Sequence, residues 1–513
     1  MGARKGGVAL AAACAIAVSV TVGLSGCGLS LFFPVVDEST PTGEDVEAAL
    51  EPFYGQVIAW DACEEFQCAT AMAPLDWDDP GAGEIELALI RQPARTERAG
   101  TLLVNPGGPG ASGFDAVARA IDVTATEALQ DRYDIVGFDP RGVGRSTAIS
   151  CFPPAELDKL LYGNPRGSRG SDEWITTQND LTHKFGQACL AKSGALLANV
   201  DTLSTARDLD MLRAALGEEQ LDYLGYSYGA YLGTVYAGAF PDRVGRMVLD
   251  GAIDPSIGHA AMTLAQAQGI ETSLRSYLAS CMPDATCPFE GTVDDGMAKV
   301  RGILDAVRKN PIPSSDGRVL TAETLLIAIA APLYDDETWP VLDQVLASVV
   351  AGQAEFALSA VDGYYGRTPE GAYAGNLAEA LRAITCIDYP AQNNVEAMKE
   401  QARQLNDAAP YVGVFLTYGD LSCLSWPHHP ELPRAPIAAA GAAPILVLGT
   451  TNDPSTPYEW AVAVAAQLES GVLVTRQGDG HTAFNTGNAC VDATVEQYLV
   501  EGVVPPADVT CPP

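Results

Sequence analysis

The sequence predicts an α/β fold in which helices flank a mostly parallel sheet and a second, helical segment is inserted. From about residue 50 onward, short β-branched or aliphatic runs alternate with longer Ala/Leu-rich stretches, the pattern of parallel strands joined by helices. Several of these runs are apolar throughout, as strands covered on both faces must be. Between residues 255 and 435 the strand-like runs disappear and helical patterns continue.

Composition and charge narrow the class of protein. The 513 residues include 30 Lys and Arg against 65 Asp and Glu, a formal net charge of −35. Because phosphate backbones are held by clustered Lys and Arg, we expect no nucleic-acid partner. With 47% apolar and 19% charged residues, the chain is globular with a large core, not disordered.

The first residues predict an export signal. Arg4 and Lys5 precede an apolar run over 8–23 that ends in LSGC, which is typical of a secretory signal peptide, here residues 1–26. The last four letters resemble the bacterial lipoprotein signal, which makes Cys27 the expected lipid attachment. We therefore expect a chain lipid-anchored to the outer face of the cell membrane, or partly secreted. Ordinary secretion and a retained membrane helix remain alternatives.

Residues 27–49 are expected to form a tether. They contain the stretch DESTPTGEDVE, which is rich in acidic residues, Ser, Thr, Pro and Gly. Such a composition is typical of a solvated linker.

Six apolar runs are the predicted strands of the sheet, and they fall into two groups on either side of the inserted segment. We divide the chain into a core of 50–254 and 436–513 and a helical cap over 255–435. The two core stretches together approach the ~250–300 residues at which one hydrophobic core stops growing, so the cap needs a core of its own. The predicted strands are 101–106, 134–139, 221–227, 246–253, 444–453 and 471–477.

Ten cysteines remain if Cys14 and Cys27 belong to the signal and the anchor. An even number outside the cytosol indicates disulfides, whereas the absence of a CxxC pair argues against a structural metal. Spacing does not fix the connectivity, and pairing in sequence order is the simplest hypothesis. It joins Cys63 to Cys68, Cys151 to Cys189, Cys281 to Cys287, Cys386 to Cys423, and Cys490 to Cys511.

The segment GYSYG at 225–229 is the main functional signal. It is the only G-x-S-x-G in the chain, it follows an apolar strand, and an unbroken Ala/Tyr/Leu helix follows it. A nucleophilic Ser requires this strand–turn–helix context, because the hydroxyl must stand on a sharp turn where glycines leave room for neighbouring backbone. Ser227 is therefore the predicted nucleophile.

A Ser hydroxyl needs a base, and four histidines follow Ser227. His259 opens the cap, and His428 and His429 lie in a Pro-rich turn. His481 instead lies in the small-residue loop GDGHTAFN, directly after a predicted core strand. We predict that His481 is the base.

The matching acid is predicted at Asp453, at the end of the preceding strand. Asp479 is the alternative, but it is too close in sequence to His481 to reach back beneath the imidazole. Asp453 would hold the histidine tautomer and stabilise the imidazolium. The order Ser, Asp, His is that of the α/β-hydrolases.

The loop NPGGPGASG at 105–113 is the predicted source of oxyanion donors. Its glycines let backbone N–H groups approach a substrate. Since Pro109 has no N–H, we expect the amides of Gly108 and Tyr228 to donate. A second loop, DPRGVGRS at 139–146, is expected to be structural.

Taken together, these motifs resemble the α/β-hydrolase serine peptidases related to proline iminopeptidase and tripeptidyl aminopeptidase, including lipoprotein members of the bacterial cell envelope. The resemblance runs from about residue 50 to the end. Iminopeptidases usually carry HGGPG, whereas Pro106 stands at the position of that His here. The resemblance therefore implies release of short peptides, most simply tripeptides, from free amino termini of peptide or protein substrates.

An aminopeptidase must bind an ammonium group, and a cation removed from water needs a carboxylate partner. The candidates are Asp388, in TCIDYP, and the acidic run at 335–338. An extended chain advances ~3.3–3.6 Å per residue, so tripeptide release requires an ammonium site ~10 Å from the scissile carbonyl.

Three alternatives remain open. The same residues suit an esterase or lipase, or an enzyme that releases single residues as proline iminopeptidase does. A non-catalytic envelope binding protein could also use this fold. No metal or organic cofactor is implied, because Ser, His and Asp need none.

Overall fold

The structure, a computed structural model, describes residues 37–283, 287–429 and 434–513. The proposed signal peptide and Cys27 lie outside the described residues. No helix within the described ranges is both long and apolar enough to cross a bilayer.

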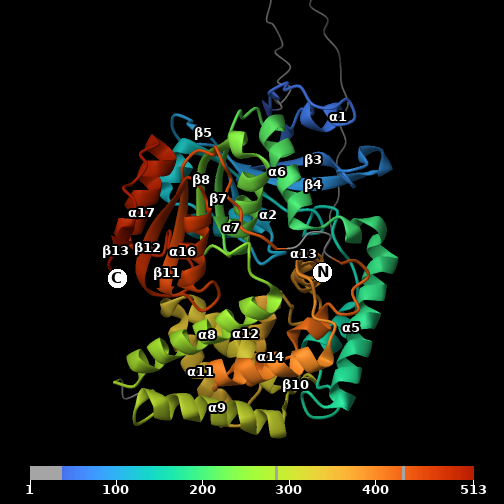
Figure 1. Ribbon diagram of the computed structural model, residues 1–513, viewed down its shortest axis with the longest axis vertical. Coiled ribbons are helices and arrows are strands. Elements are labelled where there is room, and N and C mark those ends of the chain that lie inside the picture. Colours follow the sequence, from blue (N-terminus) through green and yellow to red (C-terminus); the bar gives the residue numbers. More distant parts are fainter. Residues whose placement is uncertain (1–36, 284–286, 430–433) are drawn as a thin grey trace, which may run out of the picture. The chain divides into compact units, whose positions relative to one another are not determined.

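A large sheet forms the centre of the fold (Figure 1). In the spatial order of the sheet, the strands from β6 (Tyr133–Phe138) to β13 (Val509–Cys511) run parallel to one another. Strands β1 to β4 pair antiparallel and continue the sheet beyond β6. In spatial order the strands are β1 (Asp37–Glu38), β2 (Ala59–Cys63), β3 (Phe66–Pro74), β4 (Glu84–Gln92), β6 (Tyr133–Phe138), β5 (Gly100–Asn105), β7 (Leu221–Tyr226), β8 (Val244–Asp250), β11 (Ile445–Asn452), β12 (Gly471–Asp479) and β13 (Val509–Cys511).

All six predicted strands are present, within three residues of the predicted bounds. β5 and β6 are buried at every position, which explains their apolar sequences. The antiparallel strands β1 to β4 and the terminal strand β13 were not predicted. β1 and β13 have only two and three residues. β2 to β4 are partly exposed, so their sequences carry polar residues between the apolar ones.

Helices cover both faces of the sheet. One face packs in a hydrophobic cluster with α1, α5, α6, α7 and α16, and the other face packs in a second cluster with α2, α3 and α17. The helices are α1 (Glu51–Tyr54), α2 (Gly113–Thr124), α3 (Glu127–Arg132), α4 (Pro154–Leu161), α5 (Asp172–Ser193), α6 (Thr202–Ala215), α7 (Tyr228–Ala239), α16 (Tyr458–Gln467) and α17 (Ala489–Glu496).

The cap, residues 255–435, is helical where the structure describes it, apart from the two-residue strands β9 (Ile312–Pro313) and β10 (Val319–Leu320). It contains a third hydrophobic cluster, built mainly from α8 to α12. The cap helices are α8 (His259–Cys281), α9 (Val293–Lys309), α10 (Ala322–Ala330), α11 (Trp339–Val350), α12 (Glu355–Tyr365), α13 (Leu377–Asp388), α14 (Val395–Ala408) and α15 (Gly413–Leu416).

Helix α13 differs from the other cap helices in what it packs against. Its apolar residues Ala380, Ala383, Ile384 and Ile387 belong to the cluster on the sheet and not to the cap cluster. The cap and core therefore share a hydrophobic boundary along α13.

Residues 37–49 depart from the expected solvated tether. Asp37 and Glu38 pair with β2, and the amide of Thr42 donates to the carbonyl of Ala214. Glu44, an acidic residue of this segment, forms ion pairs with Arg213 and Arg243. The local sequence of this segment suggests a linker, but arginines of the core pair with its acidic residue Glu44. The segment from residue 37 onward is therefore attached to the core.

Five disulfides join the cysteines in sequence order, namely Cys63–Cys68, Cys151–Cys189, Cys281–Cys287, Cys386–Cys423 and Cys490–Cys511. Disulfides persist in oxidising compartments, which indicates a chain that is exported.

Candidate active site

Ser227 stands on a strained turn between β7 and α7. Its φ of 57° and ψ of −121° lie outside the regions that L-residues normally occupy. A Cβ on Gly225 would lie 2.3 Å from the carbonyl oxygen of Gly229, and a Cβ on Gly229 would lie 2.4 Å from that of Asn105. The two glycines of the motif are thus required by close backbone approach, and the turn leaves the Ser227 side chain partly exposed.

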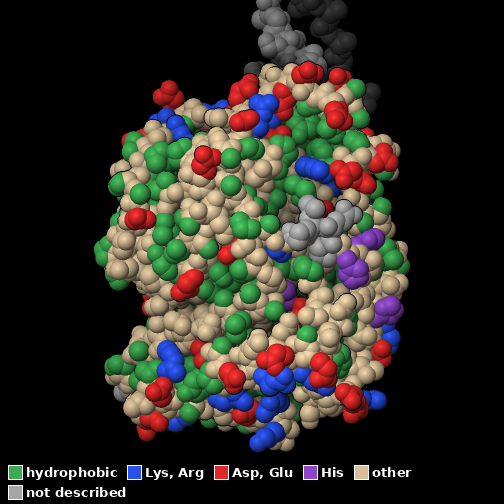
Figure 2. Space-filling view, viewed as in Figure 1, with side chains coloured by type: hydrophobic (Ala, Val, Ile, Leu, Met, Phe, Trp, Pro, Cys, Tyr) green, Lys and Arg blue, Asp and Glu red, His purple; other side chains and the backbone are tan. Residues whose placement is uncertain are grey.

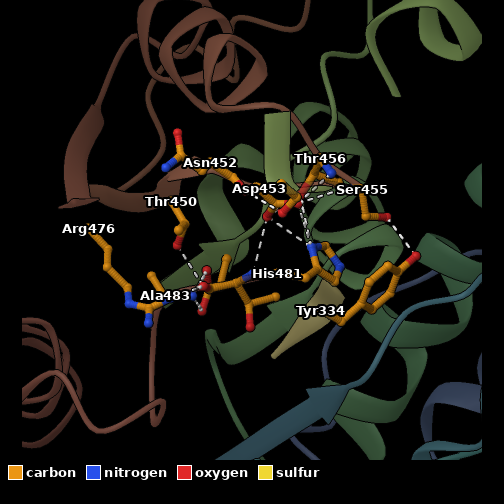
Figure 3. Close-up of polar contacts among 12 residues, drawn as sticks. Tyr334, Thr450, Asn452, Asp453, Ser455, Thr456, Arg476, His481 and Ala483 are labelled. Atoms are coloured by element: carbon orange, nitrogen blue, oxygen red, sulfur yellow. Dashed lines mark hydrogen bonds and ion pairs between the residues drawn. The ribbon is translucent and has the colours of Figure 1, made fainter. Parts of the chain in front are cut away.

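His481 and Asp453 form a hydrogen-bonded pair (Figure 3). Nδ1 of His481 lies 2.9 Å and 3.0 Å from the two oxygens of the Asp453 carboxylate. Because a carboxylate only accepts, Nδ1 carries the proton and Nε2 is left as an acceptor. This is the tautomer that a general base needs.

The Asp453 carboxylate is held by its own turn. It is 2% exposed and accepts from the amides of Ser455 and Thr456, the hydroxyl of Thr456 and the amide of Thr482. These contacts fix the orientation of the carboxylate, and with it the orientation of the imidazole.

The pKa of His481 is raised. Burial acts to lower this pKa, but the charge and hydrogen bond of Asp453, with a further contribution from the charge of Asp250, outweigh burial. The neighbouring carboxylates therefore favour the imidazolium that forms when the histidine takes a proton.

Asp250 connects the serine turn with the histidine loop, a role that its place in the sequence does not predict. Its backbone carbonyl accepts from the amide of Ser227 at 2.8 Å. Its fully buried carboxylate accepts from the amides of Ala483 and Phe484 at 2.8–3.0 Å. Burial raises the pKa of Asp250 to about 6, so it is ionised at neutral pH.

The serine turn and the histidine loop thus both contact the end of β8. A Cβ on Gly251, the residue after Asp250, would lie 3.2 Å from Cε1 of His481. Among the described residues no direct hydrogen bond joins the Ser227 hydroxyl to the imidazole. Such bonds are often long in unliganded serine hydrolases and tighten when substrate binds.

The predicted oxyanion loop passes directly against the serine turn. A Cβ on Gly107 would lie 2.9 Å from the amide nitrogen of Tyr228 and 3.0 Å from Cβ of Ser227. In the described part of the chain, the amides of Gly108 and Tyr228 donate to no protein acceptor. Both amides can therefore donate to a substrate oxygen.

The loop at 139–146 has the structural role that its sequence predicts. Asp139 accepts from the hydroxyl of Ser112 and from the amides of Phe114 and Arg145, which fixes the start of α2 behind the oxyanion loop. Arg141 is fully buried and forms an ion pair with the equally buried Asp208.

Asp388 ends helix α13 near the serine turn. Its oxygens accept from the amide and hydroxyl of Thr202 at 3.0 Å and 2.5 Å, and that hydroxyl lies 2.6 Å from the phenol of Tyr228. Burial, partly opposed by the bonds from Thr202, raises the pKa of Asp388 to about 7. One side chain therefore separates Asp388 from the residue after the nucleophile.

The remaining candidates are distributed as follows. Asp479, the alternative acid, accepts from the side-chain amide of Asn452 and forms no bond to His481 among the described residues. His259 pairs with Asp420 within the cap. The acidic run at 335–338 directly follows Tyr334, whose ring contacts His481.

Comparison with known proteins shows the family of this fold. A family model described as alpha/beta hydrolase fold matches residues 100–293, and one described as TAP-like protein matches residues 409–511. Serine protease Hip1 of Mycobacterium tuberculosis (strain ATCC 25618 / H37Rv) is 34% identical over 483 residues, which cover 90% of this chain and 92% of that protein. This chain belongs to the α/β-hydrolase family of serine peptidases.

Two further relatives of this α/β-hydrolase differ in their named activity. Tripeptidyl aminopeptidase of Streptomyces lividans is 34% identical over 466 residues, 88% of this chain and 85% of that protein. Carboxylesterase B of Mycobacterium tuberculosis (strain ATCC 25618 / H37Rv) is 35% identical over 506 residues, 95% and 96% of the two chains. This α/β-hydrolase is an enzyme of the serine hydrolase class, and its relatives support peptidase activity on peptide or protein substrates.

Proposed function

We propose that this enzyme releases short peptides, in the simplest case tripeptides, from the free amino termini of peptides or proteins outside the cytosol. Ser227 is the nucleophile, His481 the base and Asp453 the acid. The observation that carries the proposal is the hydrogen-bonded His481–Asp453 pair together with the strained Ser227 turn. Asp250 accepts hydrogen bonds both from this turn and from the histidine loop.

The proposed reaction proceeds through an acyl-enzyme. Oγ of Ser227 attacks the scissile carbonyl carbon while Nε2 of His481 takes the hydroxyl proton. The oxyanion accepts hydrogen bonds from the amides of Gly108 and Tyr228, and the positive end of α7 faces the same charge. The C–N bond then breaks, and His481 returns the proton to the leaving amine. Water, deprotonated by His481, releases the amino-terminal fragment and regenerates Ser227.

The ammonium group of the substrate is proposed to bind near Asp388 or the acidic run at 335–338. Asp388 is linked through the hydroxyl of Thr202 to the phenol of Tyr228, the residue that follows the proposed nucleophile. Tripeptide release needs a separation of ~10 Å between the ammonium site and the scissile carbonyl, against ~3.5 Å for release of one residue. Asp388→Asn should raise KM for free-amino substrates and leave hydrolysis of a small ester unchanged.

The experiment that tests the proposal compares a tripeptide anilide with its amino-acetylated form and identifies the products of an unblocked longer peptide by mass spectrometry. We expect cleavage of the free form and release of tripeptides. Ser227→Ala should abolish both, while Ser359→Ala, at an exposed position on α12, should leave them intact. Equal rates for the free and acetylated anilides would contradict the aminopeptidase proposal, and single-residue products would indicate iminopeptidase-like release.

An esterase is the second candidate, and the carboxylesterase B relative favours it. The acyl-enzyme chemistry is the same for an ester. Rapid hydrolysis of medium-chain esters without cleavage of the unblocked peptide would establish this alternative.

The cellular location proposed is the outer face of the cell membrane. Residues 1–26 are proposed to be a signal peptide and Cys27 the lipidated residue, which the disulfides support by indicating export. Mass spectrometry of the mature protein should find a diacylated or triacylated Cys27 as its first residue, and an unmodified amino terminus would contradict the anchor.

A further inference from the structure

We propose that Tyr334, a residue of the cap, positions the imidazole of His481, so that the seating of the cap on the sheet controls the rate of the chemical step. The inference rests on the proposed role of His481 as the base. Tyr334 is the last residue of the short helical turn η4 (Ala331–Tyr334), which follows α10.

Three contacts from Tyr334 converge on the histidine and its acid (Figure 3). The Tyr334 carbonyl accepts the backbone N–H of His481 at 2.7 Å, and the Tyr334 ring lies 4.9 Å from the imidazole in an edge-on arrangement. The Tyr334 phenol donates to the hydroxyl of Ser455 at 3.1 Å. The amide of Ser455 in turn donates to the Asp453 carboxylate at 2.8 Å. Tyr334 therefore contacts His481 directly and reaches the Asp453 carboxylate through Ser455.

The histidine loop depends on such external contacts. Gly480 and Thr482, on either side of His481, both have positive φ values, of 101° and 70°. Four successive amides of this loop donate out of it: that of residue 481 to Tyr334, that of residue 482 to Asp453, and those of residues 483 and 484 to Asp250. Of the three acceptor residues, only Tyr334 belongs to the cap.

Gly480 in the histidine loop allows the cap backbone to approach closely. A Cβ on Gly480 would lie 3.0 Å from the carbonyl oxygen of Tyr334. Any larger residue at position 480 would press against the cap backbone, and the φ of Gly480 would strain it further.

The location of Tyr334 argues for positioning and against core packing. Leu333 and Ile329, just before it, are fully buried in the cap cluster, so the backbone of Tyr334 moves with that cluster. Tyr334 is 36% exposed and belongs to none of the hydrophobic clusters of the described residues, so it lies at the edge of the cap and outside its core. Its ring and phenol contact the imidazole of His481 and the turn of Asp453, and these contacts orient His481.

The test uses two variants and two substrates. Tyr334→Phe removes the bond to Ser455, and Tyr334→Leu also removes the ring contact, while both keep the backbone acceptor. The substrates are p-nitrophenyl acetate, too small to need the cap, and a tripeptide anilide. Phe356→Leu is the matched control, because Phe356 is 37% exposed on α12 of the same cap.

We expect Tyr334→Leu to lower kcat on both substrates by the same factor, about 10- to 100-fold, as small misplacements of catalytic groups do. KM should stay within about twofold, Tyr334→Phe should be intermediate, and Phe356→Leu should match the wild type. The acid limb of kcat/KM should move to lower pH in Tyr334→Leu, because a looser imidazole loses part of the contact with Asp453 that raises its pKa. Unchanged melting temperatures would show that these effects are not loss of fold.

Two outcomes would overturn the inference. A rise in KM for the anilide with unchanged hydrolysis of the acetate would make Tyr334 a wall of the peptide subsite, and unchanged kinetics on both substrates would show that it positions nothing. Failure of the proposed function is distinguishable, because the wild type would then leave the free-amino tripeptide anilide uncleaved. The effect of Tyr334→Leu on kcat would in that case still be read on p-nitrophenyl acetate.

Discussion

At the scale of single residues, the chemistry depends on contacts that sequence spacing reveals only in part. The pairing of His481 with Asp453 was predictable, because each residue follows a recognisable apolar strand, and the structure places the two side chains in hydrogen-bond contact. Asp250 and Tyr334 were not predictable, because their bonds to the histidine loop span more than a hundred residues and depend on neighbouring strands and on the cap.

The raised pKa of His481 predicts the pH dependence. As the proposed base, His481 must be unprotonated at Nε2 to accept the serine proton, so kcat/KM should fall as the pH drops through a value above 6.5, the ordinary pKa of histidine. Removing a negative charge near the imidazole should lower its pKa. Asp250→Asn should therefore shift this acid limb to lower pH in a pH–rate profile, with the Asn oxygen still able to accept from the loop.

Asp479→Asn is the matched control for Asp250→Asn. Asp479 lies two residues from His481, but its carboxylate bonds to Asn452 and is not among the groups that shift the pKa of His481. An acid limb that stays in place in both variants would show that Asp250 has no electrostatic effect on the base.

At the scale of elements, the strands that were predicted and those that were missed differ in burial. The predicted parallel strands lie in the middle of the sheet and have continuous apolar sequences. In β4 the alternation of Glu84, Ile85, Glu86 and Leu87 was a readable signal of a half-buried strand. β1 and β13 have two and three residues, too few to show any period.

The buried pair of Arg141 and Asp208 joins the loop after β6 to helix α6. Removing one partner of this pair should lower the free energy of unfolding. Arg141→Leu leaves Asp208 as an uncompensated buried charge, which should cost ~3–5 kcal/mol of unfolding free energy. Replacing both residues, as in Arg141→Leu with Asp208→Leu, should restore part of this loss, because the orphaned charge is gone.

Urea denaturation of the two single variants and the double variant would measure this coupling. Arg207→Leu, which removes a partner from the ion pair with the exposed Asp78, is the control and should cost less than about 1 kcal/mol. Strictly additive losses in the Arg141 and Asp208 cycle would contradict a coupled buried pair.

At the scale of the whole molecule, the charge is strongly negative and unevenly distributed. The net charge is −35. On the face seen in Figure 2, acidic side chains are spread widely, whereas Lys and Arg gather mainly over the cap helices, where several pair with neighbouring acids. The field of such a molecule attracts cationic amino termini and is screened by salt.

This charge predicts a salt dependence. Raising the ionic strength from about 0.01 M to 0.1 M shortens the screening length from ~30 Å to ~10 Å, so kcat/KM for a free-amino peptide should fall several-fold. The neutral p-nitrophenyl acetate should show no such change. Equal salt effects on both substrates would show that salt acts on the enzyme itself and not on the attraction of the charged substrate.

The position of the cap boundary shows what sequence patterns leave open. The change from strand-like to helical patterns marks the cap, but the packing of α13 against the sheet depends on residues such as Ala380 and Ile384 that fit either cluster. Tyr334 likewise follows an ordinary cap helix in sequence and reaches the active site only through tertiary packing.

Ser227 is proposed to be a nucleophile that His481 activates across the end of β8. Reaction with a fluorophosphonate, followed by peptide mapping, tests this activation. We predict one modified residue, Ser227, with a labelling rate reduced at least ~1000-fold in His481→Ala and unchanged in His259→Ala, whose histidine pairs with Asp420 in the cap. Labelling at another serine, or a rate that does not depend on His481, would contradict the account.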